Sequence, residues 1–224
     1  GASLRSSRAT PLKQRQRGRF AAGIPAQKER REMRLGTLEK LLIRSPLRAF
    51  MLRTLEAPKV LSSLGIAGKS VCLEIGCGNG TGALLINQHL DCERIIGIDV
   101  DPEMVAAARE SLSHPARWAR DIRTDNIEFL CEDATNPAFP DCCFDAVFLF
   151  GVLHHIKAWK KAISGVYRIL KEGGVFSFVE EPLLPAFLYH PGSPALRLAY
   201  EFIGAVPISE RALRAALERT GFSI

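Results

Sequence analysis

A carboxylate and a row of glycines stand together in the segment LEIGCGNGTG, residues 73–82. Glu74 lies two positions before the first glycine, and glycines then occupy every second position from 76 to 82. Glycine tolerates positive φ and allows a ligand to approach the backbone closely. A helix that starts after such a turn offers free N–H groups and the positive end of its dipole. The segment is therefore a candidate ligand-binding turn with a carboxylate beside it.

A second carboxylate follows at a spacing typical of adenosine binding. Asp99 ends the apolar run RIIGID, nineteen residues after Gly80, and a carboxylate there can accept hydrogen bonds from both hydroxyls of a ribose. A dinucleotide site is the main competitor, but the G-x-G-x-x-G pattern finds Thr81 at its third glycine position. No P-loop lysine follows the turn. The pattern therefore favours an adenosine ligand.

The residues around these carboxylates alternate between two apolar patterns. Short runs rich in β-branched and aromatic residues predict strands, and amphipathic runs between them predict helices. The predicted strands are 71–75, 94–98, 127–130, 144–150 and 174–179, and the clearest helices are 101–112 and 159–170. This alternation predicts an α/β fold with a doubly wound, mostly parallel sheet and helices on both faces. In such a sheet the glycine turn lies at the carboxyl end of the first parallel strand, where ligands bind.

Capping residues mark the ends of the predicted helices. Ser45, Asp101 and Ser209 are each expected to begin a helix, since their side-chain oxygens can accept a hydrogen bond from the first turn. Gly173 and Gly221 are expected to end helices, because glycine adopts the left-handed conformation that follows a helix.

With Glu74 in place, the turn resembles the E/D-x-G-x-G-x-G motif of class I S-adenosylmethionine-dependent methyltransferases. Four further segments, 95–109, 129–139, 144–155 and 169–181, resemble blocks of the same family in the same order. The resemblance covers roughly residues 68–181 and implies a Rossmann-like fold, S-adenosyl-L-methionine as cofactor, and methyl transfer as the reaction. A sulfonium flanked by an ammonium and a carboxylate also suits a site without phosphate clamps.

The resemblance implies a role for each matching residue around the cofactor. Gly76, Gly78 and Gly80 would hold the methionine portion, and Glu74 would support the loop near the ammonium group. Asp99 would bind the ribose hydroxyls.

The adenine ring would be bound by the next two segments. Asp133 would accept a hydrogen bond from the adenine amino group, beside the backbone of Ala134. Val100 would pack on one face of the ring, although an apolar residue there is equally well explained as part of the core.

Two histidines follow the fourth predicted strand on the methyl-donor side. His154 and His155 are the candidate catalytic residues, because a general base is needed when the acceptor arrives protonated. A pocket-lining role stays open, and a metal role is disfavoured because adjacent side chains are expected to diverge. Glu180 and Glu181 either bind the acceptor or cap the rim of the sheet.

The expected acceptor is a small, apolar or aromatic molecule. The fourth strand is followed neither by an Asn/Asp-Pro-Pro-aromatic turn nor by Pro-Cys, so methylation of nucleic-acid bases is less favoured. The loop resembles those of the broad group of methyltransferases that act on quinones, sterols, fatty-acid derivatives and other small molecules. Two alternatives remain open: a nucleic-acid methyltransferase that uses a basic arm, and a non-catalytic S-adenosylmethionine-binding assembly factor.

Charge divides the chain into unequal parts. Residues 1–53 hold 14 Lys/Arg against 3 Glu, a net +11, whereas the whole chain is only +6. We predict a basic, disordered arm over 1–34, a helical segment over 35–68 and the S-adenosylmethionine-binding domain over 69–224. The arm has three open interpretations: a solvated tail, an organelle transit segment or a polyanion-binding arm.

Two parts of the predicted domain differ from a regular alternation of strands and helices. Residues 182–207 are apolar and bounded by prolines, and we predict a lid over the acceptor, with packing against the helix predicted over 46–56 as the alternative. The chain stops at residue 224 as the family's sixth strand would begin. The C-terminal hairpin is therefore expected to be truncated, which would leave one sheet edge open.

Apolar runs and cysteines indicate the compartment. The longest apolar run is far shorter than the roughly 20 residues of a membrane span, and no signal peptide pattern opens the chain. The six cysteines contain no C-x-x-C pair, which favours reduced thiols over a zinc site. These features predict a cytoplasmic location, with organelle import through the basic arm as the alternative.

Overall fold

The computed structural model describes residues 2–6, 45–61, 64–66, 69–179, 205–206 and 208–224. The lid predicted over 182–207 lies outside the described residues except for residues 205–206, and Glu180 and Glu181 lie outside them as well.

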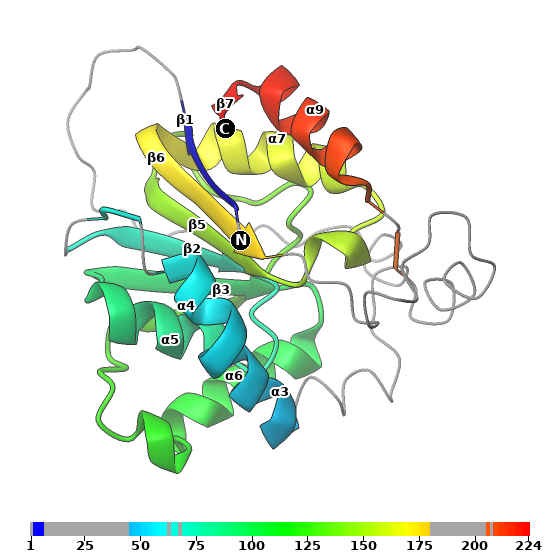
Figure 1. Cartoon of the computed structure of the whole chain (residues 1–224). Helices are drawn as coiled ribbons and strands as arrows, with labels where there is room; N and C mark the ends of the chain where they lie inside the picture. Colours follow the sequence, from blue (N-terminus) through cyan, green and yellow to red (C-terminus); the bar gives the residue numbers. More distant parts are fainter. Residues whose placement is uncertain (1, 7–44, 62–63, 67–68, 180–204, 207) are drawn as a thin grey trace.

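A five-stranded parallel sheet forms the centre of the molecule, as the alternating pattern predicts (Figure 1). Two short strands extend it, one antiparallel to the fifth parallel strand, in the order β4-β3-β2-β5-β6-β1-β7. The strands are β1 (Ala2–Ser6), β2 (Val71–Ile75), β3 (Arg94–Asp99), β4 (Ile127–Cys131), β5 (Phe144–Phe150), β6 (Leu170–Val179) and β7 (Phe222–Ser223). The chain crosses from one half of the sheet to the other between β4 and β5, so β2 and β5 are neighbours.

Helices cover both faces of this sheet (Figure 1). Alternate residues of each strand point to opposite faces, so the described core divides into two clusters. One cluster lies under α4, α5 and α6, and the other lies under α7 and α9. The helices are α3 (Pro46–Met51), a π-helical turn η1 (Leu52–Glu56), α4 (Ala57–Leu61), α5 (Thr81–Leu90), α6 (Pro102–Ser113), α7 (Trp159–Ile169) and α9 (Glu210–Thr220), with short 3-10 turns η2 (Arg117–Ala119) and η3 (Leu153–His155).

Most of the predicted helix ends are confirmed. The side chains of Ser45, Asp101 and Ser209 each accept a backbone N–H from the first turn of the helix that they cap. Gly221 ends α9 with a φ of 106°. Gly173 does not end a helix: α7 already stops at Ile169, and Gly173 lies inside β6 with a φ of 69°.

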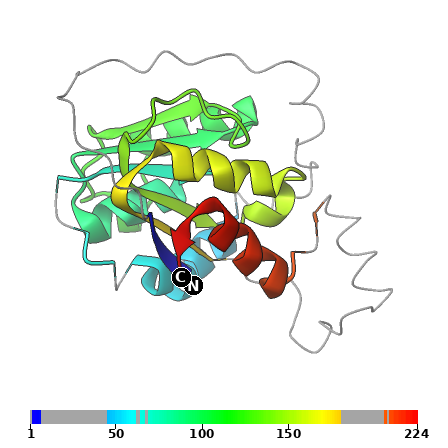
Figure 2. The same ribbon diagram turned by 90° about the horizontal axis from the view of Figure 1, so that it is seen from above.

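The N-terminal residues Ala2–Ser6 correct two expectations. They form β1 and pair antiparallel with β6, from Ala2 opposite Phe178 to Arg5 opposite Val175. β1 also pairs with β7 at the end of the chain (Figure 2). The expectation of disorder is therefore wrong for these five residues, and the edge of β6 expected to be open is paired. The exposed N–H and C=O groups of β6 supply the hydrogen bonds that a short polar segment needs.

The helical segment before the sheet is longer than the predicted 46–56. It begins at Pro46, passes through the π-helical turn and ends with α4 at Leu61. Its inner face packs on the sheet, where the Ser177 hydroxyl donates a 3.1 Å hydrogen bond to the Val60 carbonyl. The outer face is exposed and carries the large apolar side chains Leu47, Phe50, Met51 and Leu55.

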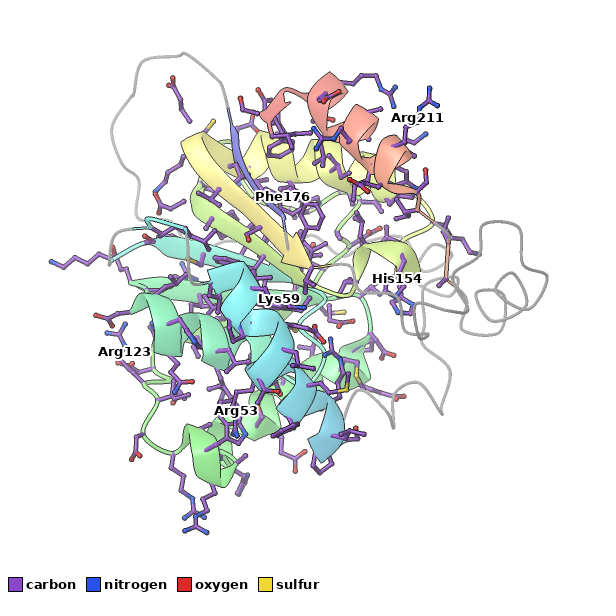
Figure 3. All side chains as sticks on the ribbon, in the orientation of Figure 1. Arg53, Lys59, Arg123, His154, Phe176 and Arg211 are labelled. Carbon is purple, nitrogen blue, oxygen red and sulfur yellow. The ribbon has the colours of Figure 1, made fainter. Side chains whose placement is uncertain are left out.

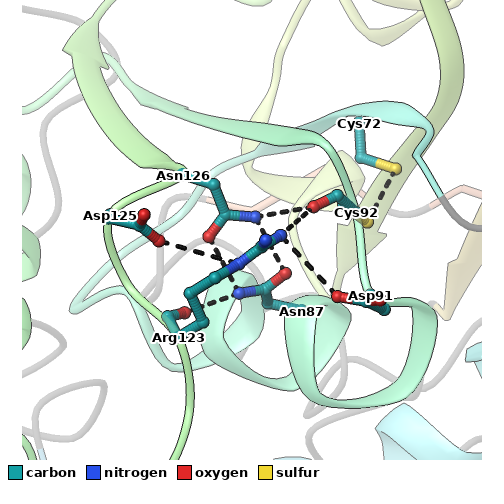
Figure 4. A network of polar contacts seen from close by, with 7 residues as sticks. All are labelled: Cys72, Asn87, Asp91, Cys92, Arg123, Asp125 and Asn126. Carbon is teal, nitrogen blue, oxygen red and sulfur yellow. Dashed lines mark hydrogen bonds and ion pairs between the residues drawn. The ribbon is translucent and has the colours of Figure 1, made fainter.

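A polar network closes the amino end of the sheet (Figure 4). The side-chain amides of Asn87 and Asn126 exchange two hydrogen bonds of 3.0 Å, joining the end of α5 to the residue before β4. Asn126 also donates to the carbonyl of Cys92, whose sulfur lies 3.3 Å from that of Cys72. These contacts are internal to the fold, and the glycine turn lies at the opposite, carboxyl end of the sheet.

Candidate functional site

The glycine turn has the conformation that its sequence requires. Gly76, Gly78 and Gly80 have φ values of 72°, 51° and 84°, a region in which other residues are strained. The Gly76 N–H donates to the carbonyl of Ile98 over 2.8 Å, which holds the turn against the end of β3. A Cβ on Gly76 would lie 2.5 Å from the side chain of Val152, so the turn packs closely against the loop after β5.

Glu74 lies beneath this turn and is almost completely buried, with 2% of its surface exposed. Its carboxylate accepts a hydrogen bond from the N–H of Ala83 in the first turn of α5. One oxygen, Oε2, has no hydrogen-bond partner among the described residues. Gly82 makes room for the carboxylate, since a Cβ there would overlap Oε1.

The surroundings of Glu74 disfavour its negative charge. Burial raises the pKa of the Glu74 carboxyl well above its usual range, whereas the Ala83 N–H lowers it. The charge of Asp99 adds to the increase and that of Arg48 opposes it. A cationic group at Oε2 would therefore find an acceptor that has no other partner and would stabilise the ionised form.

Asp99 connects the second strand to the glycine turn, as the spacing predicts. Its Oδ2 accepts the N–H of Gly78 over 3.1 Å, and its Oδ1 accepts the N–H of Asp101 over 2.9 Å. Each carboxylate oxygen can accept a second hydrogen bond. Burial raises the pKa of Asp99 to about 6, although these N–H groups lower it. The carboxylate is thus held in place with acceptor capacity left for a ligand.

The segment after β4 lies beside Asp99. The N–H of Glu132 donates to the Asp99 carbonyl over 3.0 Å. The next residue, Asp133, is buried and its Oδ1 accepts the N–H of Thr135 over 2.7 Å, which shapes the turn that contains Ala134. Val100 is half-buried between the two segments. The structure therefore places Val100, Asp133 and Ala134, the residues predicted around an adenine ring, at the same carboxyl end of the sheet as Asp99.

His154 and His155 lie in η3, which is separated from the end of β5 by two residues. Figure 3 labels His154. Their ring centroids are 4.2 Å apart, so the expectation that the side chains diverge is wrong. Burial, and then the charge of His154, lower the pKa of His155 to about 4. The carbonyl of His154 accepts a 2.6 Å hydrogen bond from Val206, so the end of the segment predicted as a lid touches this loop. No group of three or more His, Cys, Asp or Glu suited to a metal ion occurs within the described ranges.

Arg48 is the functional candidate that sequence reasoning missed. Its guanidinium pairs with the carboxylate of Glu56 and places Nη2 3.4 Å from the carbonyl of Phe150, at the carboxyl end of β5. The same Nη2 is 3.6 Å from the position of a Cβ on Gly151. This contact joins residues 102 positions apart, so local spacing offers no signal for it.

Comparison with known proteins identifies a family that the chain resembles. Residues 73–178 match the family described as "Methyltransferase domain". The chain is 32% identical over 123 residues to the uncharacterized methyltransferase YcgJ of Bacillus subtilis, which covers 53% of this chain but only 45% of that protein. It is 29% identical over 171 residues to the demethylmenaquinone methyltransferase of Thermus thermophilus, covering 68% of this chain and 74% of that protein.

Solved structures support the same fold. An S-adenosylmethionine-dependent methyltransferase from Aquifex aeolicus superposes with a TM-score of 0.62 at 19% identity, over 84% of this chain and 89% of that chain.

In the part of the chain that the structure describes, every helix is too short or too polar to cross a membrane.

Proposed function

Because this chain contains a class I S-adenosylmethionine-dependent methyltransferase domain, we propose that it transfers the methyl group of S-adenosylmethionine to a small, apolar or aromatic acceptor by direct in-line displacement. The observation that carries the proposal is the joining of Glu74, Asp99 and the glycine turn at one edge of the sheet. Each satisfies a different part of this cofactor, which is the cofactor of the domain family.

The residues present fit the cofactor chemically. The buried Oε2 of Glu74 suits the ammonium group, directly or through a water molecule, and the close-packed glycine turn suits the methionine chain. The oxygens of Asp99 can accept the ribose hydroxyls while they keep their backbone N–H donors. Asp133, the Ala134 backbone and Val100 would then surround the adenine.

Methyl transfer needs little further catalysis from the protein once cofactor and acceptor are aligned. The bound sulfonium supplies an electrophilic methyl group with a good leaving group. The residues of this chain hold it, orient the acceptor and exclude water. We assign His154 and His155 to the acceptor side, where they would line the pocket. With a pKa of about 4, His155 is neutral at physiological pH but is a weak base, so a dominant general-base role is not favoured.

The proposed acceptor class rests on chemistry and on likeness. The Thermus thermophilus relative is named for a quinone acceptor, demethylmenaquinone, and this chain covers 74% of that protein. An acceptor with an acidic hydroxyl or an activated ring carbon would also fit a site whose histidine is a weak base.

A turnover screen tests the proposal. The purified chain is incubated with S-adenosylmethionine and a panel of hydroxylated naphthoquinones, benzoquinones, sterols and a structured RNA. Mass spectrometry then follows the gain of one methyl group by the acceptor and the formation of S-adenosylhomocysteine. We expect turnover with a quinone or sterol and none with RNA. Methylation of RNA alone, or tight binding of NAD in place of S-adenosylmethionine by calorimetry, would refute the proposal.

A further inference from the structure

Arg48 lies at the same end of the sheet as the glycine turn but comes from a different part of the chain. β2 and β5 are neighbours, with Ile75 opposite Leu149, so Gly76 and Phe150 are the next residues along two adjacent strands. Arg48 Nη2 lies 3.4 Å from the carbonyl of Phe150. The backbone of Phe150, which the guanidinium contacts, is therefore about one strand spacing, roughly 5 Å, from the turn.

Glu56 holds this guanidinium from the same helical segment. Both carboxylate oxygens of Glu56 pair with Arg48, Oε2 accepting from Nη2 over 3.0 Å. In a regular α-helix, residues eight apart are displaced by about 80° around the axis. The wider π-helical turn Leu52–Glu56 reduces this angle, so both side chains can reach the same face. A π-helical turn inside an α-helix is often associated with a functional site.

The pairing leaves part of the guanidinium available. An arginine has five N–H donors, and the contacts with Glu56 and Phe150 use three of them. The Arg48 side chain is 27% exposed, whereas that of Glu56 is 9% exposed. Arg48 therefore keeps two donors and an accessible edge, while its position is set by a buried partner.

Arg48 and Glu74 carry opposite charges at the end of the sheet that holds the glycine turn. Glu74 is buried with an unpartnered oxygen, and the charge of Arg48 acts on its carboxylate. The methionine portion of the cofactor is a zwitterion, with an ammonium and a carboxylate on the same carbon. A site with one anionic and one cationic side chain matches such a group.

We propose that Arg48 binds the carboxylate of the methionine portion, and that Glu56 is the positioning residue that aims its guanidinium. This inference rests on the proposed function, because it concerns the cofactor of that reaction. The competing interpretation is a purely structural clamp, in which Arg48 only fixes the N-terminal helical segment to the end of β5.

A pair of ligands separates the two interpretations. Calorimetry measures the affinity of the full chain for S-adenosylmethionine and for decarboxylated S-adenosylmethionine, which lacks only the carboxylate. We expect the unmodified protein to prefer the complete cofactor by at least tenfold. Arg48→Gln should weaken the complete cofactor by ten- to a hundredfold and the decarboxylated one by less than threefold, so the preference disappears.

Two further variants make the result specific. Arg53→Gln removes a cation from the same helical segment, where Arg53 lies 5.4 Å from the Trp118 ring, and should leave both affinities unchanged. Glu56→Gln keeps the size of the side chain but not its charge, and should reduce the preference by a smaller factor than Arg48→Gln does. Should Arg48→Gln fail to fold, Arg48→Lys keeps the charge without the fork and should retain only part of the preference.

The outcomes that overturn the inference are distinct. No preference in the unmodified protein, or equal weakening of both ligands by Arg48→Gln, would identify Arg48 as a structural clamp. Binding of both ligands without methyl transfer to any acceptor would refute the proposed function and leave the assignment of Arg48 standing. Absence of binding by either ligand would refute both.

Discussion

The raised pKa of Asp99 should make cofactor binding sensitive to pH. Burial raises the pKa of this carboxyl from 3.8 to about 6 in the protein without ligand. In the proposed site the ribose hydroxyls would donate to the ionised carboxylate, so binding should require loss of the proton. At pH 7 about a tenth of the molecules hold that proton, and at pH 5 about nine tenths do. The apparent affinity should therefore fall about tenfold from pH 7 to pH 5, which is about 1.4 kcal/mol.

The stability of the ligand-free protein should respond in the opposite sense. A folded-state pKa above the unfolded value means that the folded protein binds the proton more tightly. The contribution of Asp99 to the free energy of unfolding is thus fully present below about pH 4 and is lost as the pH rises through about 6. Cofactor binding should offset this loss at neutral pH, because the ribose hydroxyls then stabilise the carboxylate.

Calorimetry at pH 5, 6 and 7 measures both the affinity and the protons released on binding. Asp99→Asn is the matched control: it should bind more weakly at pH 7 and lose most of the pH dependence. Glu74 also has a raised pKa and can steepen the slope, so Glu74→Gln is measured in parallel. An affinity that is equal at pH 5 and pH 7, or a slope that Asp99→Asn retains, would refute the reasoning.

Three further predictions concern packing and chemistry. Gly82→Ala should abolish measurable cofactor binding and destabilise the fold by about 1–3 kcal/mol, because its Cβ would overlap the Glu74 carboxylate; calorimetry and urea unfolding check both effects. Ser177→Ala should cost about 1 kcal/mol of unfolding free energy by leaving the Val60 carbonyl without its buried donor, and an unchanged urea midpoint would contradict this. His155→Gln should lower turnover less than tenfold without changing the pH profile between 6 and 8, because a group of pKa about 4 does not titrate there; a hundredfold loss with an altered profile would establish a general base.

The glycine turn and the position of Asp99 beside it could be predicted from the sequence, because most of their signals are local. Glycines at positions 76, 78 and 80 are needed where the chain adopts positive φ, and that need depends only on neighbouring residues. The strands alternate with helices at regular spacing, and parallel strands bring their carboxyl ends to one edge. Asp99 and the glycine turn meet for this reason, although they are far apart in the chain.

The parts of the molecule that the sequence did not reveal depend on contacts between distant segments. The apolar pattern of Leu47, Phe50, Met51 and Leu55 indicated a helix but not its orientation, and the structure exposes these side chains while it buries Glu56. β1 forms by pairing with the free edge of β6. No property of residues 2–6 alone predicts this pairing.

Arg48 shows the same limit at the site itself. In the sequence it is one of 14 basic residues in the first 53, and nothing in its neighbourhood sets it apart. Its place beside Phe150 arises from the packing of α4 on the sheet and from the π-helical turn between α3 and α4. Local patterns determine which segments become strands, turns and helices, because backbone preferences act between near neighbours. The packing of a complete sheet decides which charged side chains meet at its carboxyl end, because it sets the distances between segments a hundred residues apart.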